Sequence, residues 1–311
     1  MEETILSVYH QDYKNFEHFI VDGGSTDNSV EIIKKHSSKI NWWVSEKDKG
    51  QTNAINKGLK KANGDIVMWL NSDDVLLPGA LKKAEHLFKK NPNAIMVHGK
   101  SVLYGAGKKE QIIGKKQKDL KLKYLAYIPF PQPSSFFRKK LIDETGLLDE
   151  TLHYGMDYEL LVRAALNYEI VFADELFSRY RLHDESKTNH SLKFCKDWNL
   201  VFSRVLNSFE FSEPLKKKFA DLGFSEDKTH KYKVNNKFSF HNIEKAFLYH
   251  LQIMMHFQYS EMRLEKAKQI AKEIKAISPA FYKQQKVGII NFRSSFLNKY
   301  LITLMRNFTR R

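Results

Sequence analysis

The sequence predicts an α/β fold, in which a mostly parallel sheet flanked by helices is followed by a basic helical C-terminal region. Two observations predict it. Short apolar runs alternate with helical patterns in the first part of the chain, as is typical of parallel sheets. Residues 190–311 carry 23 Lys and Arg against 10 Asp and Glu, whereas residues 1–189 carry 28 against 26. We therefore expect two domains, residues 1–189 and residues 190–311.

The expected elements follow from the spacing of apolar residues and from residues that end helices. The patterns predict strands at Phe16–Val21, Asn41–Val44, Asp65–Leu70, Ala94–His98 and Ser134–Arg138. They predict helices at Glu2–His10, Ser29–His36, Gln51–Ala62, Pro78–Lys89 and Asp157–Leu166. The lysine-rich stretch Lys108–Lys123 is expected to form a solvated loop or insert, and long basic helices are expected beyond His190.

The composition excludes several classes of protein. With 42% hydrophobic residues in 311, the chain can bury a sizeable core. The single cysteine, Cys195, excludes an internal disulfide framework and a multi-cysteine zinc site, and it fits a reducing compartment. The acidic start Met1-Glu2-Glu3 does not resemble a secretory signal, and no apolar run reaches the roughly 18 residues of a membrane span. We therefore expect a cytoplasmic protein.

Two adjacent carboxylates, Asp73 and Asp74, follow the apolar run Ile66–Leu70. This run is long enough for a buried strand and too short for a helix. Burying both carboxylates without partners would be costly, whereas at an exposed strand end they can hold a hard cation, which prefers oxygen ligands. An acidic turn without a ligand is the alternative.

A second apolar strand ends at Asp22, in the stretch VDGGSTDNS. An Asp just beyond the carboxyl end of a strand lies where open α/β sheets bind ligands. The Gly-Gly turn is neither a P-loop nor a GxGxxG fingerprint. A third polar stretch, SEKDKGQTNAINKG, contains Asp48 and predicts a loop followed by a helix that starts near Gln51.

Taken together, these segments resemble the family 2 glycosyltransferases with the GT-A fold. The stretches that carry the resemblance, in the family's order and approximate spacing, are VDGGSTDNS, SEKDKGQTNAINKG, GDIVMWLNSDD and GMDYELLVRAA. Each alone is weak, but four in order are specific, and they cover roughly residues 1–190. The resemblance implies transfer of a sugar, with inversion, from a nucleotide-diphosphate sugar to an acceptor hydroxyl.

The resemblance also implies roles for particular residues. Asp22 and Asp48 would contact the nucleotide, with turn capping as the alternative, and Asp73 would face the ribose. Asp74 would bind a divalent cation, Mn²⁺ or Mg²⁺, that bridges the diphosphate. Many members have Asp where this chain has Asn71, which argues against a site of three carboxylates but leaves room for a metal.

By the same resemblance, Asp157 in the stretch GMDYELLVRAA takes the position of the family's catalytic base. An Asp, with an ordinary pKa of about 3.9, suffices if proton transfer is late or if a partly apolar pocket raises that pKa. The alternative is an N-cap for the apolar helix that follows. His183 can add a metal or diphosphate contact, and a surface histidine after a strand is its alternative.

The start of the chain departs from the resemblance. GT-A domains normally open with a strand and a nucleotide-contacting loop ahead of the helix matched here by Glu2–Gln11. Loss of that interior strand would leave unpaired backbone on two neighbouring strands. We therefore expect that the start is truncated and that the chain as given is poorly stable. A non-catalytic truncated remnant is therefore the second functional hypothesis.

The C-terminal region contains two helical apolar patterns. The first is expected to pack and comprises Ile243, Ala246, Phe247, His250, Leu251, Met254 and Met255. The second runs among Lys and Arg residues and comprises Ile289, Phe292, Phe296, Tyr300, Leu304 and Phe308. A basic helix with an aromatic-rich face is typical of a membrane interface, and packing against the protein is the alternative.

These features lead to expected partners. We expect a nucleotide-sugar donor and a saccharide or lipid-linked acceptor, in bacterial surface polysaccharide or glycolipid synthesis, with peripheral attachment to an anionic membrane at its inner face. Binding to nucleic acid is a third hypothesis. We do not expect it, because the chain has no zinc, RRM-like or helix-turn-helix signature.

Overall fold

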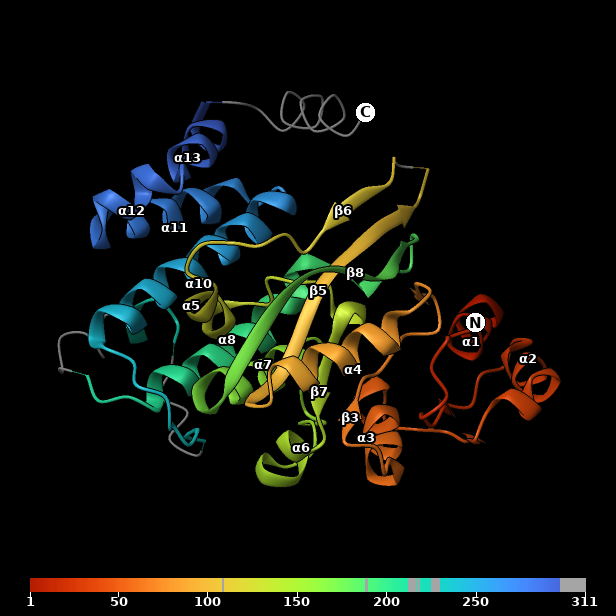
Figure 1. Ribbon diagram of the computed structural model, residues 1–311. Helices are drawn as coiled ribbons and strands as arrows, with labels where there is room; N and C mark the ends of the chain where they lie inside the picture. Colours follow the sequence, from red (N-terminus) through yellow and green to blue (C-terminus); the bar gives the residue numbers. More distant parts are fainter. Residues whose placement is uncertain (108, 188–189, 212–216, 218, 225–229, 297–311) are drawn as a thin grey trace. The chain divides into compact units, whose positions relative to one another are not determined.

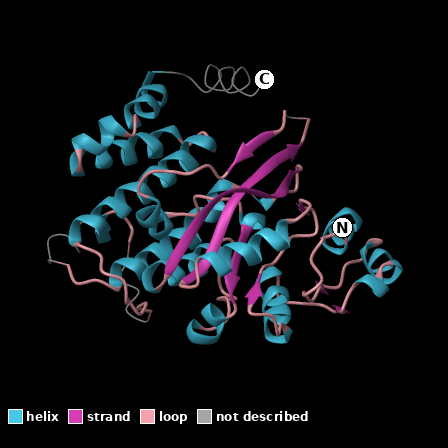
Figure 2. Cartoon of the chain, in the orientation of Figure 1, coloured by secondary structure: helices cyan, strands magenta, loops and turns pink. Residues whose placement is uncertain are grey.

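The computed structural model describes residues 1–107, 109–187, 190–211, 217, 219–224 and 230–296 (Figure 1). The chain divides into two compact units. The first comprises Met1–Lys118 and Ile128–His183, and the second comprises Asp119–Tyr127 and the residues from Asp184 onward. Among the described residues, all strands belong to the first unit, while helices account for the regular structure of the second (Figure 2).

The first unit contains a small sheet of two parallel strands, β1 (Phe19–Asp22) and β2 (Trp42–Ser45), which end together because Asp22 pairs with Ser45. Ile5, Ile33 and Ile40 form a buried cluster beside it. The helices of this unit are α1 (Glu2–Tyr9), α2 (Ser29–Lys35), α3 (Gln51–Lys61), α4 (Ala80–Lys90), α6 (Lys140–Thr145) and α7 (Met156–Asn167), with 3₁₀ turns η1 (Ser37–Lys39) and η2 (Gln132–Ser134).

The large sheet has the strand order β3-β7-β5-β8-β4, with β6 beside β5. Its strands are β3 (Ile66–Val67), β4 (Val75–Leu76), β5 (Ala94–Gly105), β6 (Gln111–Ile113), β7 (Ser135–Arg138) and β8 (Glu169–Leu182). Only β5 and β8 pair in parallel, while β3–β7, β5–β7, β5–β6 and β4–β8 are antiparallel.

The α/β class is confirmed, and β1–β2 and β5–β8 pair in parallel as expected, whereas the other strand pairs of the large sheet are antiparallel. Strands β3 and β5 do run in the same direction, as the alternation of strands and helices predicts, since each is antiparallel to β7. Strand β7 comes later in the chain and lies between them. Alternation along the chain indicates the direction of successive strands and not which strands become neighbours.

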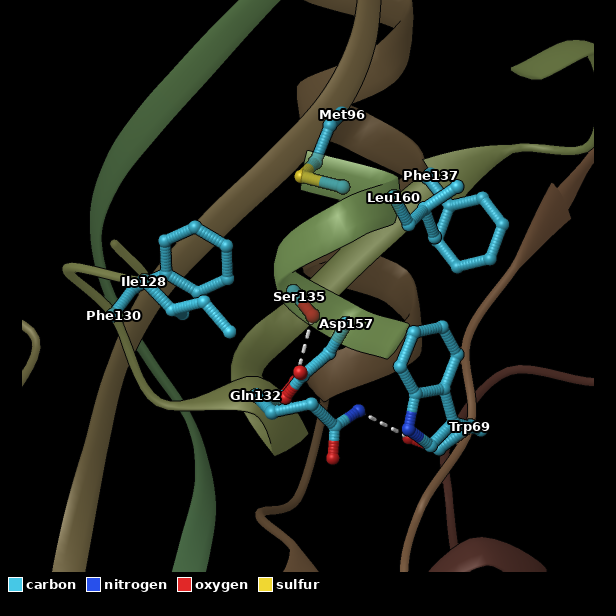
Figure 3. A pocket seen from close by; sticks show the side chains of 9 residues that line it. All are labelled: Trp69, Met96, Ile128, Phe130, Gln132, Ser135, Phe137, Asp157 and Leu160. Atoms are coloured by element: carbon cyan, nitrogen blue, oxygen red, sulfur yellow. Dashed lines mark hydrogen bonds between the residues drawn. The ribbon is translucent and has the colours of Figure 1, made fainter. Parts of the chain in front are cut away.

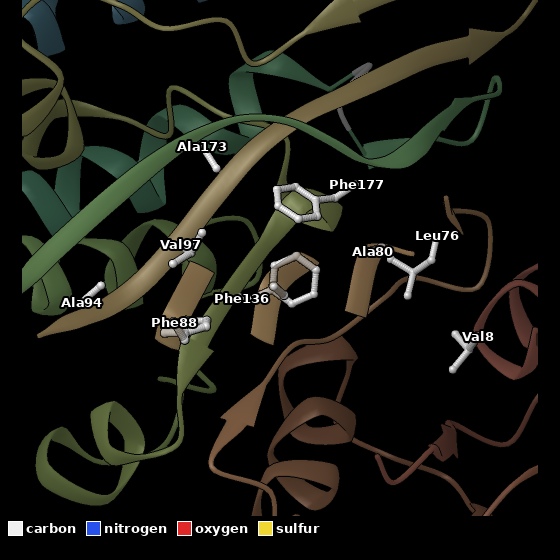
Figure 4. Close-up of a cluster of buried hydrophobic side chains, with 10 residues drawn as sticks. Val8, Leu76, Ala80, Phe88, Ala94, Val97, Phe136, Ala173 and Phe177 are labelled. Atoms are coloured by element: carbon white, nitrogen blue, oxygen red, sulfur yellow. The ribbon is translucent and has the colours of Figure 1, made fainter. Parts of the chain in front are cut away.

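The core of the large sheet forms where α4 packs against β5 and β8 (Figure 4). Ala80, Ala84 and Phe88 recur every four residues and therefore lie on one side of α4. Their partners in the buried cluster include Val97, Phe136 and Phe177 (Figure 4). This core supports the strands whose ends carry the candidate site.

Helix α1 connects the two sheets. Ile5 packs in the cluster beside the small sheet, whereas Val8 packs in the core of the large sheet. Thr4 Oγ1 donates to the Ser72 carbonyl at 2.8 Å, and Gln11 Nε2 donates to the Leu77 carbonyl at 3.0 Å. In the described part of the chain, β1 pairs only with β2 and β3 only with β7. The truncated start stays a prediction.

The predicted strand Asp65–Leu70 is shorter in the structure. The ladder contains only Ile66 and Val67, which pair with β7. The backbone then leaves the sheet, and the Trp69 carbonyl accepts a hydrogen bond from Gln132 Nε2 at 2.9 Å instead of a strand partner.

The stretch Lys108–Lys123 was expected to be a solvated loop or insert, and this is wrong in part. Residues 111–113 form β6, which pairs with β5. The stretch then enters α5 (Leu120–Ala126), whose Tyr124, Leu125 and Ala126 are buried. Many lysines obscured both elements, because long lysine side chains can reach water from an ordered backbone.

The second unit is helical, as predicted. Besides α5, its helices include α8 (Ser191–Asn207), α10 (Phe240–Ser260), α11 (Leu264–Ile277), α12 (Pro279–Gln284) and α13 (Val287–Phe296). The first apolar pattern lies on α10, and all seven of its residues are buried. His250 of this pattern stacks on Phe202 of α8. No helix in the described residues is both long and apolar enough to cross a bilayer.

Candidate active site

Asp22 lies at the carboxyl end of the small sheet, where the parallel strands β1 and β2 end side by side. Its buried carboxylate accepts four hydrogen bonds, from the Gly24 and Ser25 backbone N–H groups at 3.0 Å, the Ser45 hydroxyl at 2.6 Å and the Ser25 hydroxyl at 2.5 Å. Burial works to raise the pKa of Asp22, but these bonds outweigh it and lower the pKa below 3.8. The carboxylate therefore stays ionised and holds the turn.

Asp48 lies against the same turn. Its Oδ1 accepts a hydrogen bond from the Gly50 backbone N–H at 2.8 Å. A Cβ added at Gly23 would lie 2.6 Å from Asp48 Oδ2, so the absence of a side chain at Gly23 permits this approach. The structure thus brings Asp22 and Asp48, both predicted to bind a nucleotide, to one edge of the small sheet.

Asp73 lies in the acidic loop, residues 71–74, which follows β3. Its side chain is 32% exposed, and Oδ2 lies 2.9 Å from Nε2 of His183, whose side chain is 40% exposed. The pair joins residues that are far apart in the sequence, at the end of β8 and after β3. Both partners are accessible to a ligand.

Asp74, the next residue, is fully buried. Its Oδ1 accepts the Arg181 backbone N–H at 3.0 Å, and its Oδ2 accepts the Asn71 side-chain amide at 3.4 Å. Burial raises the pKa of Asp74 from 3.8 to about 7, against the opposing effect of the hydrogen bond from Arg181. This burial argues against the predicted role of Asp74 as an open metal ligand, because its oxygens face donors of the chain itself.

Arg181 ties the acidic loop to β8. Besides its backbone bond to Asp74, its Nε donates to the Asp73 carbonyl at 3.0 Å. Its guanidinium also pairs with Glu3 of α1. Arg181 therefore holds the loop at the Asp73 carbonyl and at the Asp74 carboxylate, while the Asp73 carboxylate faces His183.

Asn71 connects three segments of the first unit. Its Oδ1 accepts a hydrogen bond from Gln51 Nε2 at 2.8 Å, and its amide nitrogen lies 3.4 Å from Asp74 Oδ2 and 3.5 Å from Gln132 Oε1. An Asp here would place a second carboxylate beside Asp74, whereas the amide suits both oxygen neighbours. The departure from the family pattern at Asn71 therefore has a local reason.

Asp157 lies in the first turn of α7 and lines a pocket (Figure 3). The other lining residues are Trp69, Met96, Ile128, Phe130, Gln132, Ser135, Phe137 and Leu160. Asp157 Oδ1 accepts the Tyr158 backbone N–H at 2.9 Å, while Gly155 takes the N-cap position that was the alternative for Asp157. Gln132 borders both this pocket and Asn71, so the pocket and the acidic loop share one neighbour.

A divalent cation fits this arrangement if the substrate supplies part of the ligand set. In the described ranges, no group of three or more His, Cys, Asp and Glu side chains could hold a metal ion. Asp73 and His183 offer one oxygen and one nitrogen donor. Cations at nucleotide sites commonly use one or two carboxylates together with substrate phosphates and water. The two residues would therefore suffice only with a phosphate-bearing ligand.

Sequence reasoning missed three residues of this site: Gln51, Gln132 and Arg181. Gln51 is inside the recognised stretch SEKDKGQTNAINKG, and Arg181 lies near the end of β8, two positions before His183, which follows the strand. Gln132 lies between two prolines, where a polar residue is a weak signal. Gln51 and Gln132 do not titrate, and Arg181 acts through bonds to a distant loop, so a search for titratable clusters in the sequence does not indicate these roles.

The model for glycosyl transferase family 2 matches residues 1–146. An uncharacterised glycosyltransferase of Rickettsia typhi is 27% identical over 221 residues, covering 68% of this chain and 69% of that protein. A poly-β-1,6-N-acetyl-D-glucosamine synthase of Staphylococcus epidermidis is 35% identical over 121 residues, covering 38% of this chain and 28% of that protein.

Solved structures show the same fold. S. aureus TarS 1–349 in complex with UDP-GlcNAc superposes with a TM-score of 0.56 at 17% identity, covering 94% of this chain and 86% of that one. A mannosyltransferase from Pyrobaculum calidifontis in complex with GDP-Man and Mn²⁺ superposes with a TM-score of 0.53 at 15% identity, covering 96% and 83%. The fold is GT-A, and residues 1–146 of the chain belong to glycosyl transferase family 2.

Proposed function

We propose that the protein transfers a sugar from a nucleoside-diphosphate sugar to an acceptor hydroxyl, with inversion at the anomeric carbon. The observation that carries this proposal is the position of Asn71, which links the start of α3, the acidic loop and the edge of the Asp157 pocket. The acidic loop, which would bind the diphosphate, and Asp157, which would act as the base, thereby become parts of one site. Bound UDP-GlcNAc in TarS and bound GDP-Man in the mannosyltransferase support a donor of this class.

The nucleotide would bind at the edge of the small sheet. We assign Asp48 to direct contact with it. Because both oxygens of Asp22 already accept hydrogen bonds, Asp22 would act chiefly by holding the turn Gly23–Ser25 in shape. Gly23 serves the same purpose, since it lets the two loops meet.

The diphosphate would lie at the acidic loop. Asp73 and His183 would hold the divalent cation, which when bound would offset the negative charge of the leaving diphosphate. The presence of Mn²⁺ in the mannosyltransferase complex supports this cofactor. Asp74 would keep the loop in place through its hydrogen bond to the backbone of Arg181.

Asp157 would act as the general base. Its carboxylate would take the proton of the acceptor hydroxyl while the acceptor oxygen forms a bond to the anomeric carbon and the bond to the diphosphate oxygen breaks. The aromatic side chains of Trp69, Phe130 and Phe137 line the same pocket and would exclude water from the reacting oxygen. Gln132 would fix the relative position of this pocket and the acidic loop.

The acceptor would be a saccharide, free or linked to a lipid. The match to a poly-β-1,6-N-acetyl-D-glucosamine synthase supports a role in bacterial surface polysaccharide or glycolipid synthesis. We propose that the reaction takes place in the cytoplasm at the inner face of the cell membrane.

A thermal-denaturation panel with Mn²⁺ and nucleoside diphosphates tests the proposal. A ligand that binds only the native state stabilises it by about 2.7 kcal/mol at a hundred times its dissociation constant. We expect UDP or GDP to raise the melting temperature only when Mn²⁺ is present, and less in Asp73→Asn than in the parent. No rise with any nucleoside diphosphate, or a rise with oligonucleotides alone, would contradict the proposal.

A further inference from the structure

Helix α13 has two different faces. Val287 and Ile290 are buried with exposed fractions of 1% and 8%, and they are one turn apart. Ile289 and Phe292 are also one turn apart, but their exposed fractions are 48% and 56%. The helix therefore packs through one apolar face while a second apolar pair faces solvent.

The exposed pair stands out from the rest of the described chain. Large hydrophobic side chains that are strongly exposed occur there at Tyr9, Ile112, Phe240, Ile289 and Phe292. The first three are far apart in the sequence, as is normal for single exposed apolar residues on a protein surface. Only Ile289 and Phe292 fall within one turn of the same helix.

Basic residues flank the exposed pair. Lys286 is exposed and precedes Ile289 by three positions, while Arg293 lies next to Phe292 and seven positions after Lys286. Ile289, Phe292 and Arg293 follow at spacings of three and four on one side of α13, and Lys286 lies in the turn just before the helix, with a left-handed φ of 53°. We call this set, Lys286, Ile289, Phe292 and Arg293, the outer face of α13.

No acidic residue offsets this charge within its part of the sequence. After Glu273 the sequence has no Asp or Glu, whereas it has Lys275, Lys283, Lys286 and Arg293 up to residue 296 and further Lys and Arg beyond. Residues 190–311 as a whole carry 23 basic against 10 acidic residues. A surface of opposite charge would be attracted to this region.

Packing against α12 keeps the outer face oriented. A Cβ added at Gly288 would lie 3.3 Å from the ring of Tyr282, so glycine allows the two helices to approach closely. Tyr282 in turn lies under the ammonium group of Lys275, at 5.7 Å from the ring centroid. The outer face is thus presented by a packed helix.

We propose that the outer face of α13 docks on an anionic lipid membrane. Ile289 and Phe292 enter the interface between headgroups and acyl chains, while Lys286 and Arg293 face the anionic headgroups. An acidic protein surface or a nucleic acid would pair with Lys286 and Arg293. Neither would offer Ile289 and Phe292 an apolar environment, whereas a membrane offers both. The proposal does not depend on the sugar-transfer chemistry proposed above.

Co-sedimentation of the full chain with vesicles tests the proposal. The probes are vesicles of phosphatidylcholine mixed with the anionic lipid phosphatidylglycerol, and vesicles of phosphatidylcholine alone. The parent protein should bind the anionic vesicles more tightly, and salt should weaken that binding. Failure of the parent to bind anionic vesicles at low salt would overturn the proposal.

Two pairs of substitutions assign the binding to the outer face. Ile289→Ser with Phe292→Ser should weaken vesicle binding by about tenfold or more, since burying each large side chain contributes on that order. Lys286→Gln with Arg293→Gln should weaken it by about fivefold for each charge. Parental affinity in both double variants would overturn the proposal.

A matched control separates docking from loss of folding. Ile112→Ser and Phe240→Ser remove exposed side chains elsewhere, with exposed fractions of 47% and 54%, and should leave vesicle binding unchanged. Equal loss of binding in the control would contradict the assignment to α13. All variants should keep the parental melting temperature and metal-dependent nucleotide binding, which distinguishes failure of the docking proposal from failure of the proposed function.

Discussion

At the end of β1, Asp22 accepts hydrogen bonds from its own turn and from Ser45, and none of its oxygens is left without a donor. After β3, two neighbouring carboxylates differ from each other. Asp74 is buried against donors of the chain, as Asp22 is, whereas Asp73 is partly exposed and contacts His183. Asp22 and Asp74 are therefore used to hold loops, whereas Asp73 is left accessible to a ligand.

This comparison teaches that the position of a carboxylate at a strand end does not decide its task. A carboxylate whose oxygens accept backbone and hydroxyl hydrogen bonds stabilises a loop, because those donors must be given up before a ligand can take their place. An exposed carboxylate with a second donor beside it can bind a cation at lower cost. Substitutions at the carboxylates can break or sharpen this distinction.

The largest expected effect concerns Asp157, the carboxylate that lines the pocket. Asp157→Asn should lower turnover by about 10²–10⁴-fold, which is the usual contribution of a general base, with donor affinity unchanged. Steady-state kinetics together with calorimetric donor binding measures both. Asp143→Asn is the control, because that carboxylate pairs with Lys139 on the surface. Near-parental turnover in Asp157→Asn would show that Asp157 is not the base and has only a structural role in the first turn of α7.

The next effect is a dependence of stability on pH that arises from Asp74. Its pKa is about 7 in the folded protein and 3.8 by its ordinary value. Between these two pH values the unfolded chain loses this proton while the folded chain keeps it, so the stability contributed by Asp74 falls as pH rises from about 4 to about 7. The fall could reach about 4 kcal/mol, since one pKa unit corresponds to about 1.4 kcal/mol.

Asp74→Asn provides the comparison for this measurement, because an amide does not titrate. Denaturant unfolding of parent and variant at several pH values, with a chelator present, should show the parent losing stability relative to the variant across that range. A constant difference between them from pH 4 to pH 7 would show that Asp74 ionises normally.

A smaller effect separates Asp73 from Asp74 as cation ligands. Asp73→Asn should weaken Mn²⁺-dependent binding of a nucleoside diphosphate by about 100-fold, since even residues that only orient ligands contribute 10–100-fold. Asp74→Asn should weaken it less, through the loop alone. Isothermal titration of both variants measures the difference. A larger loss in Asp74→Asn would restore Asp74 as the ligand that the sequence predicted.

The smallest effect tests the turn at the small sheet. Ser45→Ala removes one hydrogen bond to the ionised Asp22 and should lower the free energy of unfolding by about 1.5–3 kcal/mol. Ser37→Ala, in the turn η1, is a control outside the set of Asp22 donors. If chemical denaturation gives equal stabilities for Ser45→Ala and the parent, the Asp22 turn does not depend on this strand-to-strand bond.

Local patterns predicted a good part of the fold. Helices α3, α4 and α7 follow from apolar residues at helical spacing, and each lies within about two residues of its predicted bounds. Strands β1, β2 and β7 were likewise recognised from short apolar runs. Strands β4, β6 and β8 were not predicted. Two or three residues are too few to show a period in β4 and β6.

The sequence by itself determined the α/β class, the four family stretches and the identities of the carboxylates, because each depends on neighbouring residues. It also determined the strong positive charge of residues 190–311. These properties depend on composition and on the order of neighbouring residues, and both are present before the chain folds.

Only the tertiary structure decided which carboxylates are open. The burial of Asp74 depends on the backbone of Arg181, and the position of Asn71 depends on Gln51 and Gln132, all brought together from separate segments. The same holds for β7, which lies between β3 and β5 and makes the sheet mostly antiparallel. Hydrogen-bond partners and strand neighbours of this kind are set by contacts between distant segments, and no local pattern records them.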